Sequence, residues 1–216
     1  MRTRFDEQLS TLNRDLIHMG SICEEAIALA AKALANRDPE LARKTEPLSL
    51  ELAQMERSVE SLCLKLLLQQ QPVASDLRHI SAALKMITDM DRIGVQAGDI
   101  AELVTVMEPH ADRDLDLICE MARVTISMVT GSVDAFVKQD VRHARQVIDA
   151  DDVVDEYFLR VKSALIGLLT NHPEEGQDAL DLLMIAKYLE RIGDHAVNIS
   201  EWVIFSVTGS HKGAGL

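Results

Sequence analysis

The chain has 216 residues, with 22 Lys and Arg against 35 Asp and Glu, which gives a formal net charge of −13. A surface this acidic repels the phosphate backbone, so nucleic acid is excluded as a main partner. Apolar residues make up 47% of the chain but aromatic residues only 3%, and a composition dominated by Leu, Ala, Ile, Val and Met favours helices over sheets. We therefore predict an all-α protein.

Proline residues and N-cap signals divide the chain into six long helices. In chain order, these helices are expected at residues 4–36, 39–70, 75–107, 112–138, 141–170 and 175–208. Each has about 30 residues and spans about 45 Å, which is typical of helix bundles. Pro47 is expected to kink the second helix or to delay its start by a turn or two.

Three features predict a cytoplasmic protein. Cys23, Cys63 and Cys119 are an odd number of single cysteines within apolar helical patterns, as expected for buried thiols in a reducing compartment. The first residues are charged and contain no secretory signal. The apolar runs fall short of the ~18 residues that a membrane span requires.

An internal repeat relates the two halves of the chain. Residues 91–104 and 190–203 are identical at seven of fourteen positions, with an offset of 99. Nearer the start of each half the offset is 102, and there Asp38 matches Asp140 at a helix start. We predict two tandem three-helix bundles, residues 1–108 and 109–216.

Four acidic residues interrupt the apolar rows of the last two helices. Asp151 and Glu190 stand in rows that are otherwise apolar, and Asp155 and Asp194 follow one turn along at related positions. A short connection makes the two helices antiparallel, and the residue numbers sum to 345 in both the 151/194 and the 155/190 pairs. The centre of this hairpin falls between residues 172 and 173, so the four carboxylates should face one another.

Unpaired carboxylates in such a patch raise one another's pKa values, so they require protons, basic side chains or a cation. Oxygen ligands suit Mg, Ca, Mn or Fe, with Zn also possible. The alternative is a solvated face of ion pairs, for which Arg160, Lys187 and Arg191 are near in sequence. His195, beside Asp194, is expected to be exposed.

The first half retains little of this pattern. The positions equivalent to the four acids are Ser49, Ala53, Asp91 and Val95, so only Asp91 carries a carboxylate. A metal site there should be weak or degenerate.

Other catalytic signals are weak. The sequence has no Gly-rich phosphate loop, no GxSxG and no HExxH. Three DxxH pairs suggest a carboxylate-bridged di-iron protein with an oxidase or storage role, but such sites need ExxH pairs facing Glu residues in the middle of a bundle. A purely structural helical protein is the other alternative.

Three segments resemble the PhoU family of phosphate transport system regulatory proteins. They are the duplicated Arg-Ile-Gly segment preceded by Asp or Glu, the Gln-Pro-Val-Ala-Ser-Asp-Leu-Arg run at residues 71–78, and the run of residues 190–194 followed by Asn198, Ile199 and Glu201. The resemblance covers nearly the whole chain. Residues 1–3 and 7–9 resemble the actinobacterial branch of the family.

This resemblance implies a function. Members of the PhoU family are non-enzymatic cytoplasmic regulators, commonly homodimers. They repress the phosphate-starvation response by linking PstB, the ATPase of the phosphate ABC transporter, to a PhoR-type histidine kinase. Some bind multinuclear iron or zinc clusters through E/DxxxD motifs, and the matching residues here are Asp151, Asp155, Glu190 and Asp194. The departures at Ser49, Ala53 and Val95 put a first-half cluster in doubt.

Overall fold

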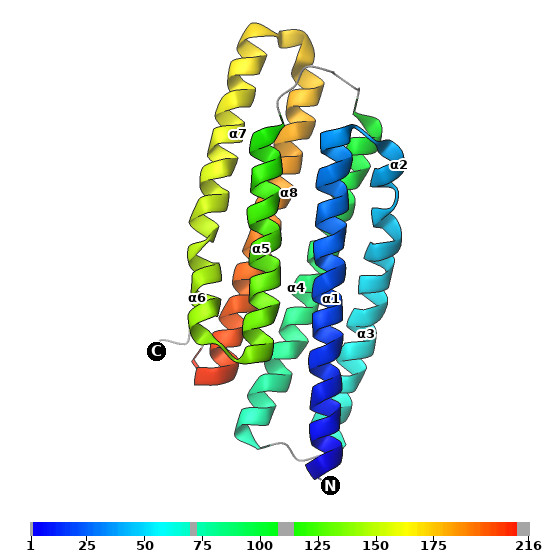
Figure 1. The fold of residues 1–216 in the computed structure, drawn as a ribbon, viewed down its shortest axis with the longest axis vertical. Helices are drawn as coiled ribbons and strands as arrows, with labels where there is room; N and C mark the ends of the chain where they lie inside the picture. The colour runs from blue at the N-terminus through cyan, green and yellow to red at the C-terminus, as the bar shows by residue number, and fades with distance from the viewer. Residues whose placement is uncertain (1, 70–72, 108–114, 211–216) are drawn as a thin grey trace.

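The computed structural model describes residues 2–69, 73–107 and 115–210, and every regular element within these ranges is helical. In chain order the helices are α1 (Arg2–Asn36), α2 (Pro39–Ala42), α3 (Thr45–Gln69), α4 (Ala74–Val106), α5 (Asp116–Lys138), α6 (Val141–Asp149), α7 (Asp151–Asn171), the short 3₁₀ helix η1 (Pro173–Glu175) and α8 (Gly176–Thr208). They lie roughly along one axis and form an elongated bundle (Figure 1). The all-α prediction is confirmed.

Two of the six expected helices are divided in the structure. In the first half, α2 ends at Ala42 and α3 begins at Thr45, which places Pro47 in the first turn of α3. The missing N–H of a proline has no helical partner to lose there, and the expected delay in the helix start is confirmed.

The second division, at Ala150, corrects the sequence prediction of one helix over residues 141–170. The Ala150 N–H is shared between the carbonyls of Gln146 and Val147, at 3.1 and 3.2 Å, and the Ala150 carbonyl accepts from the Val153 N–H at 3.1 Å. The chain therefore passes through a tighter turn of i→i+3 bonds between α6 and α7. Neither Gly nor Pro lies at this point, so the sequence carries no breaker signal.

The internal repeat extends to individual hydrogen bonds. Arg37 and Gln139, which are 102 residues apart, end α1 and α5 in the left-handed conformation, with φ of 53° and 52°. Asp38 and Asp140 follow, and each donates its N–H to the carbonyl five residues back at 2.9 Å. Each aspartate side chain then caps the N–H three residues ahead, at 3.0 and 3.1 Å. The two halves thus use the same connection between their first and second helices.

The two bundles share one core. Helices α1, α3 and α4 form the first bundle, α5, α7 and α8 form the second, and α4 packs along α8 at the seam between them (Figure 1). The buried apolar side chains form one continuous cluster through both halves. The predicted boundary between residues 108 and 109 lies outside the described residues. None of the described helices is both long and apolar enough to cross a membrane.

Candidate functional site

The α7–α8 hairpin positions the four acidic residues that the sequence singles out. Helix α7 ends at Asn171, η1 reverses the chain, and α8 begins at Gly176. The turn therefore lies at the predicted centre of the hairpin, between residues 172 and 173. Gly193 lets the two helices approach closely, because a Cβ built on it would lie 3.4 Å from Asp151 Oδ1. Asp151 therefore lies directly over the backbone of α8.

The carboxylates of the hairpin interact electrostatically. Burial, together with the negative charges of Asp194, Asp155 and their neighbours, raises the pKa of Asp151 to about 6. Burial and the charge of Glu190 also raise the pKa of Asp194. The structure therefore brings Asp151, Asp155, Glu190 and Asp194 together, and their mutual repulsion favours a proton or a cation. We call these four residues the acidic cluster.

One basic side chain partly neutralises the acidic cluster. The Lys187 ammonium forms an ion pair with Glu190, lies 5.5 Å from the centre of the Phe158 ring, and opposes the rise in the pKa of Asp194. The Arg160 guanidinium lies over the Tyr157 ring instead, at 5.3 Å. Of the three basic residues in that prediction, Lys187 is the one that pairs with a described acid of the cluster, whereas the charge of Arg191 acts on Asp99 of α4. Lys187 alone does not balance four carboxylates.

The acidic cluster suits a cation in charge and donor type but not in the placement of its oxygens. Within residues 2–69, 73–107 and 115–210, no group of three or more His, Cys, Asp or Glu side chains is arranged to hold a metal ion. The metal-ligating role of the four acids remains a prediction.

In the first half, the positions equivalent to the acidic cluster hold different residues. Ser49, the counterpart of Asp151, donates its hydroxyl to the carbonyl of Gly94 at 3.0 Å, and Gly94 is the counterpart of Gly193. Ala53 and Val95 supply no ligand atoms. Burial raises the pKa of Asp91, while the charges of Arg57 and Arg92 oppose that rise. Asp91 therefore stands beside arginines, and its charge also acts on one further acid, Glu56.

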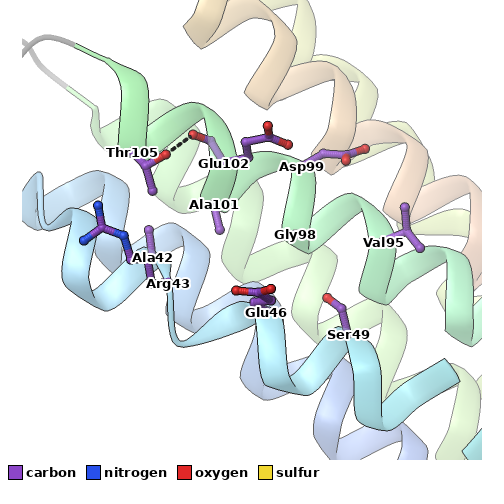
Figure 2. Close-up of a pocket in the computed structure, with 10 residues that line it drawn as sticks. All are labelled: Ala42, Arg43, Glu46, Ser49, Val95, Gly98, Asp99, Ala101, Glu102 and Thr105. Carbon is purple, nitrogen blue, oxygen red and sulfur yellow. Dashed lines mark hydrogen bonds between the residues drawn. The ribbon is translucent and has the colours of Figure 1, made fainter. Parts of the chain in front are cut away.

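A groove of about 550 Å³ opens beside Ser49, between the α2–α3 segment and α4. Figure 2 shows its ten lining residues: Ala42, Arg43, Glu46, Ser49, Val95, Gly98, Asp99, Ala101, Glu102 and Thr105. We call it the first-half groove. The sequence reasoning missed it, because its residues come from separate helices and share no motif.

His195 is not exposed as expected but lies at the seam between the halves. Only 12% of its side chain is accessible; its Nδ1 lies 2.7 Å from Asp89 Oδ1, and its Nε2 lies 3.3 Å from the Gln96 side-chain nitrogen. A neutral ring that donates from Nδ1 to Asp89 and accepts at Nε2 from Gln96 satisfies both contacts. Gln96 and His195 are themselves equivalent at the offset of 99, which is the one sequence signal for this contact.

These features define a class of protein: a duplicated helical bundle whose halves share a frame but differ at the crossing of their last two helices. The PhoU domain matches residues 16–104 and again residues 118–203. The chain therefore belongs to the PhoU family, as the resemblance in its sequence predicts.

Relatives of the chain match it over nearly its whole length. Two proteins named phosphate-specific transport system accessory protein PhoU homolog are each 31% identical to it: one from Clostridium acetobutylicum, over 96% of both chains, and one from Pseudomonas aeruginosa, over 96% of this chain and 86% of its own. The crystal structure of PhoU from Pseudomonas aeruginosa superposes with a TM-score of 0.90 at 31% identity, over 95% of this chain and 100% of its own. That of the phosphate transport system regulatory protein PhoU from Streptococcus pneumoniae gives 0.90 at 25% identity, over 96% and 99%.

Proposed function

We propose that this protein is a non-enzymatic, cytoplasmic negative regulator of the phosphate-starvation response. In this proposal it couples PstB, the ATPase of the phosphate transporter, to a PhoR-type sensor histidine kinase and so adjusts phosphate uptake. The observation that carries the proposal is the double PhoU match together with near full-length relatives named as accessory proteins of phosphate-specific transport.

The architecture supports a role in docking. Two halves with the same helical frame present related but chemically different surfaces, one with the acidic cluster and one with the first-half groove. A helical surface of this kind engages a partner by laying side chains into grooves. A protein with two such faces can contact a transporter subunit and a kinase at once, and a homodimer would double each face.

Deletion of the gene tests the regulatory role. Cells that lack the protein should express alkaline phosphatase in high phosphate, and a plasmid copy should restore repression. A pull-down with PstB and the kinase, performed at high and at low phosphate, tests the coupling. Continued repression in the deletion strain would contradict the proposal.

The proposal includes a cation at the acidic cluster, either a divalent ion or an iron or zinc cluster. Asp151, Asp155, Glu190 and Asp194 would hold it after their side chains turn toward one point, because they are not so arranged in the structure. The raised pKa of Asp151 supports it, because burial and, after it, repulsion by the neighbouring acids disfavour the charged carboxylate, and a bound cation would compensate both. Its chemical contribution would be charge neutralisation that ties α7 to α8.

Metal content measured by mass spectrometry on the purified protein tests this part. We expect metal in the wild type, little in the Asp151→Asn/Asp194→Asn variant, and an unchanged amount in the Asp91→Asn variant. Equal metal content in all three proteins would exclude the acidic cluster as the site.

A further inference from the structure

The first-half groove has an uncharged floor. Ala42, Gly98 and Ala101 keep the space between α2 and α4 open, and Val95 is 51% exposed toward one end of the groove. The aliphatic stem of a Lys or Arg side chain can lie along such an apolar surface while its charged head stays in water. The groove is therefore wide enough and apolar enough for a long side chain to enter.

Three carboxylates line the groove. Glu46 comes from α3, whereas Asp99 and Glu102 come from α4 (Figure 2). Burial and the negative charge of Glu102 raise the pKa of Asp99, and the charge of Arg191 opposes that rise. Glu46 and Glu102 make no side-chain hydrogen bond or ion pair with any other described residue.

The one basic residue of the groove does not neutralise these acids. The Arg43 guanidinium forms an ion pair with Glu40, outside the groove. In Figure 2, Arg43 extends away from Asp99 and Glu102. The charge of Arg191, which does not line the groove, acts on Asp99, but the lining residues themselves carry more negative than positive charge around an apolar floor.

This arrangement differs from that of the acidic cluster. The positions that hold Asp151 and Asp194 in the second half hold Ser49 and Val95 here, and the Ser49 hydroxyl donates its hydrogen bond to the Gly94 carbonyl. The carboxylates of the groove stand farther along the helices, at positions 46, 99 and 102. Their separation by an apolar floor suits a cationic group on an alkyl chain, whose stem and head need different surroundings.

We propose that the first-half groove is a docking site for a basic segment of a protein partner. An Arg or Lys side chain of that segment lies over Ala42, Gly98 and Ala101 and places its cationic head among Glu46, Asp99 and Glu102. The charge complementarity between groove and segment is the basis for this choice of occupant. The inference rests on the proposed function, which supplies the partners, and it identifies the surface and the chemistry by which one of them binds.

The first test concerns the chemistry of the groove and needs no partner. The wild type, labelled in its Ala and Val methyl groups, is titrated with butylguanidinium and with its neutral analogue butylurea. We expect shifts at Ala42, Val95 and Ala101 with butylguanidinium only, at concentrations on the order of millimolar because the ion pairs are partly exposed. The Glu46→Gln/Asp99→Asn/Glu102→Gln variant should show none, and equal shifts in this variant or none in the wild type would overturn the proposal.

The second test concerns the partners. Affinities for PstB and for the kinase are measured with the wild type, the same triple variant, and a control in which the exposed Glu7, Glu25 and Glu60 are changed to Gln. We expect the groove variant to lose about tenfold in affinity for at least one partner, with weaker salt dependence, and the control to bind like the wild type.

The outcomes separate the two proposals. If the groove variant binds both partners as tightly as the wild type does, the docking site is wrong and the regulatory function stands. An equal loss in the control variant would also overturn the docking site, because it would indicate a general effect of net charge. If the wild type binds neither partner, both proposals fail.

Discussion

The α3–α4 and α7–α8 crossings use the same frame for different chemistry. In each, a glycine of the last helix faces a short side chain and a buried aliphatic one: Gly94 meets Ser49 and Leu52, and Gly193 meets Asp151 and Val154. In the first half, the Ser49 hydroxyl donates a hydrogen bond to a backbone carbonyl. In the second half, the Asp151 carboxylate is repelled by neighbouring carboxylates. The duplication thus preserves the packing of the backbone at the crossing. The residue that faces the glycine, Ser49 or Asp151, decides whether the crossing contains a carboxylate.

The largest expected effect comes from filling the two glycine positions. A methyl group at Gly94 would clash with the Leu52 side chain, which is fully buried, whereas the nearest atom to a methyl at Gly193 lies 3.4 Å away. We expect Gly94→Ala to lower the free energy of unfolding by about 2 kcal/mol, and Gly193→Ala to change it by about 0.5 kcal/mol or less. Urea denaturation of both variants measures the difference, and equal effects would show that the two crossings are packed alike.

The next effect tests the cost of ionising the Asp151 carboxylate. The pKa of Asp151 rises from 3.8 to about 6 on folding, so its contribution to stability is fully present below pH 3.8 and is lost as the pH rises through 6. Asp151→Asn should therefore stabilise the protein at pH 8, by on the order of 1 kcal/mol once solvent screening of this partly exposed group is allowed for. The gain should disappear at pH 4.

Thermal unfolding at both pH values measures this change, with Glu60→Gln as an exposed control on α3. A stabilisation by Asp151→Asn that is equal at pH 4 and pH 8 would contradict the ionisation of a partly buried, repelled carboxylate as its cause.

The smallest effect concerns the counterpart of Asp151. Ser49→Ala removes the hydrogen bond to the Gly94 carbonyl and should cost about 0.5–1 kcal/mol at every pH. Ser61→Ala, which removes an exposed bond within α3, serves as the control and should cost less. If the loss of stability in Ser49→Ala depends on pH, the charge of Asp91 or Glu46 acts on this position. The two crossings would then differ less than proposed.

Much of the candidate site follows from the sequence because its determinants are local. The turn between α7 and α8 and the antiparallel direction of the two helices depend on a short connection. The pairing of Asp151 with Asp194 follows from that direction and from the helical repeat. The metal itself does not follow, because coordination depends on where each carboxylate oxygen lies, and spacing along a helix does not specify that.

The sequence by itself determined the all-helical class, nearly all of the helix ends, the duplication and the facing acids. These features arise from periodicity, from caps such as Asp38 and Asp140, and from short connections, all of which act within a few turns of helix. Only the tertiary structure decided the break at Ala150, the contact of His195 with Asp89 and the first-half groove. The break at Ala150 carries no Gly or Pro signal in the sequence, and the other two features depend on how helices far apart in the chain pack against one another.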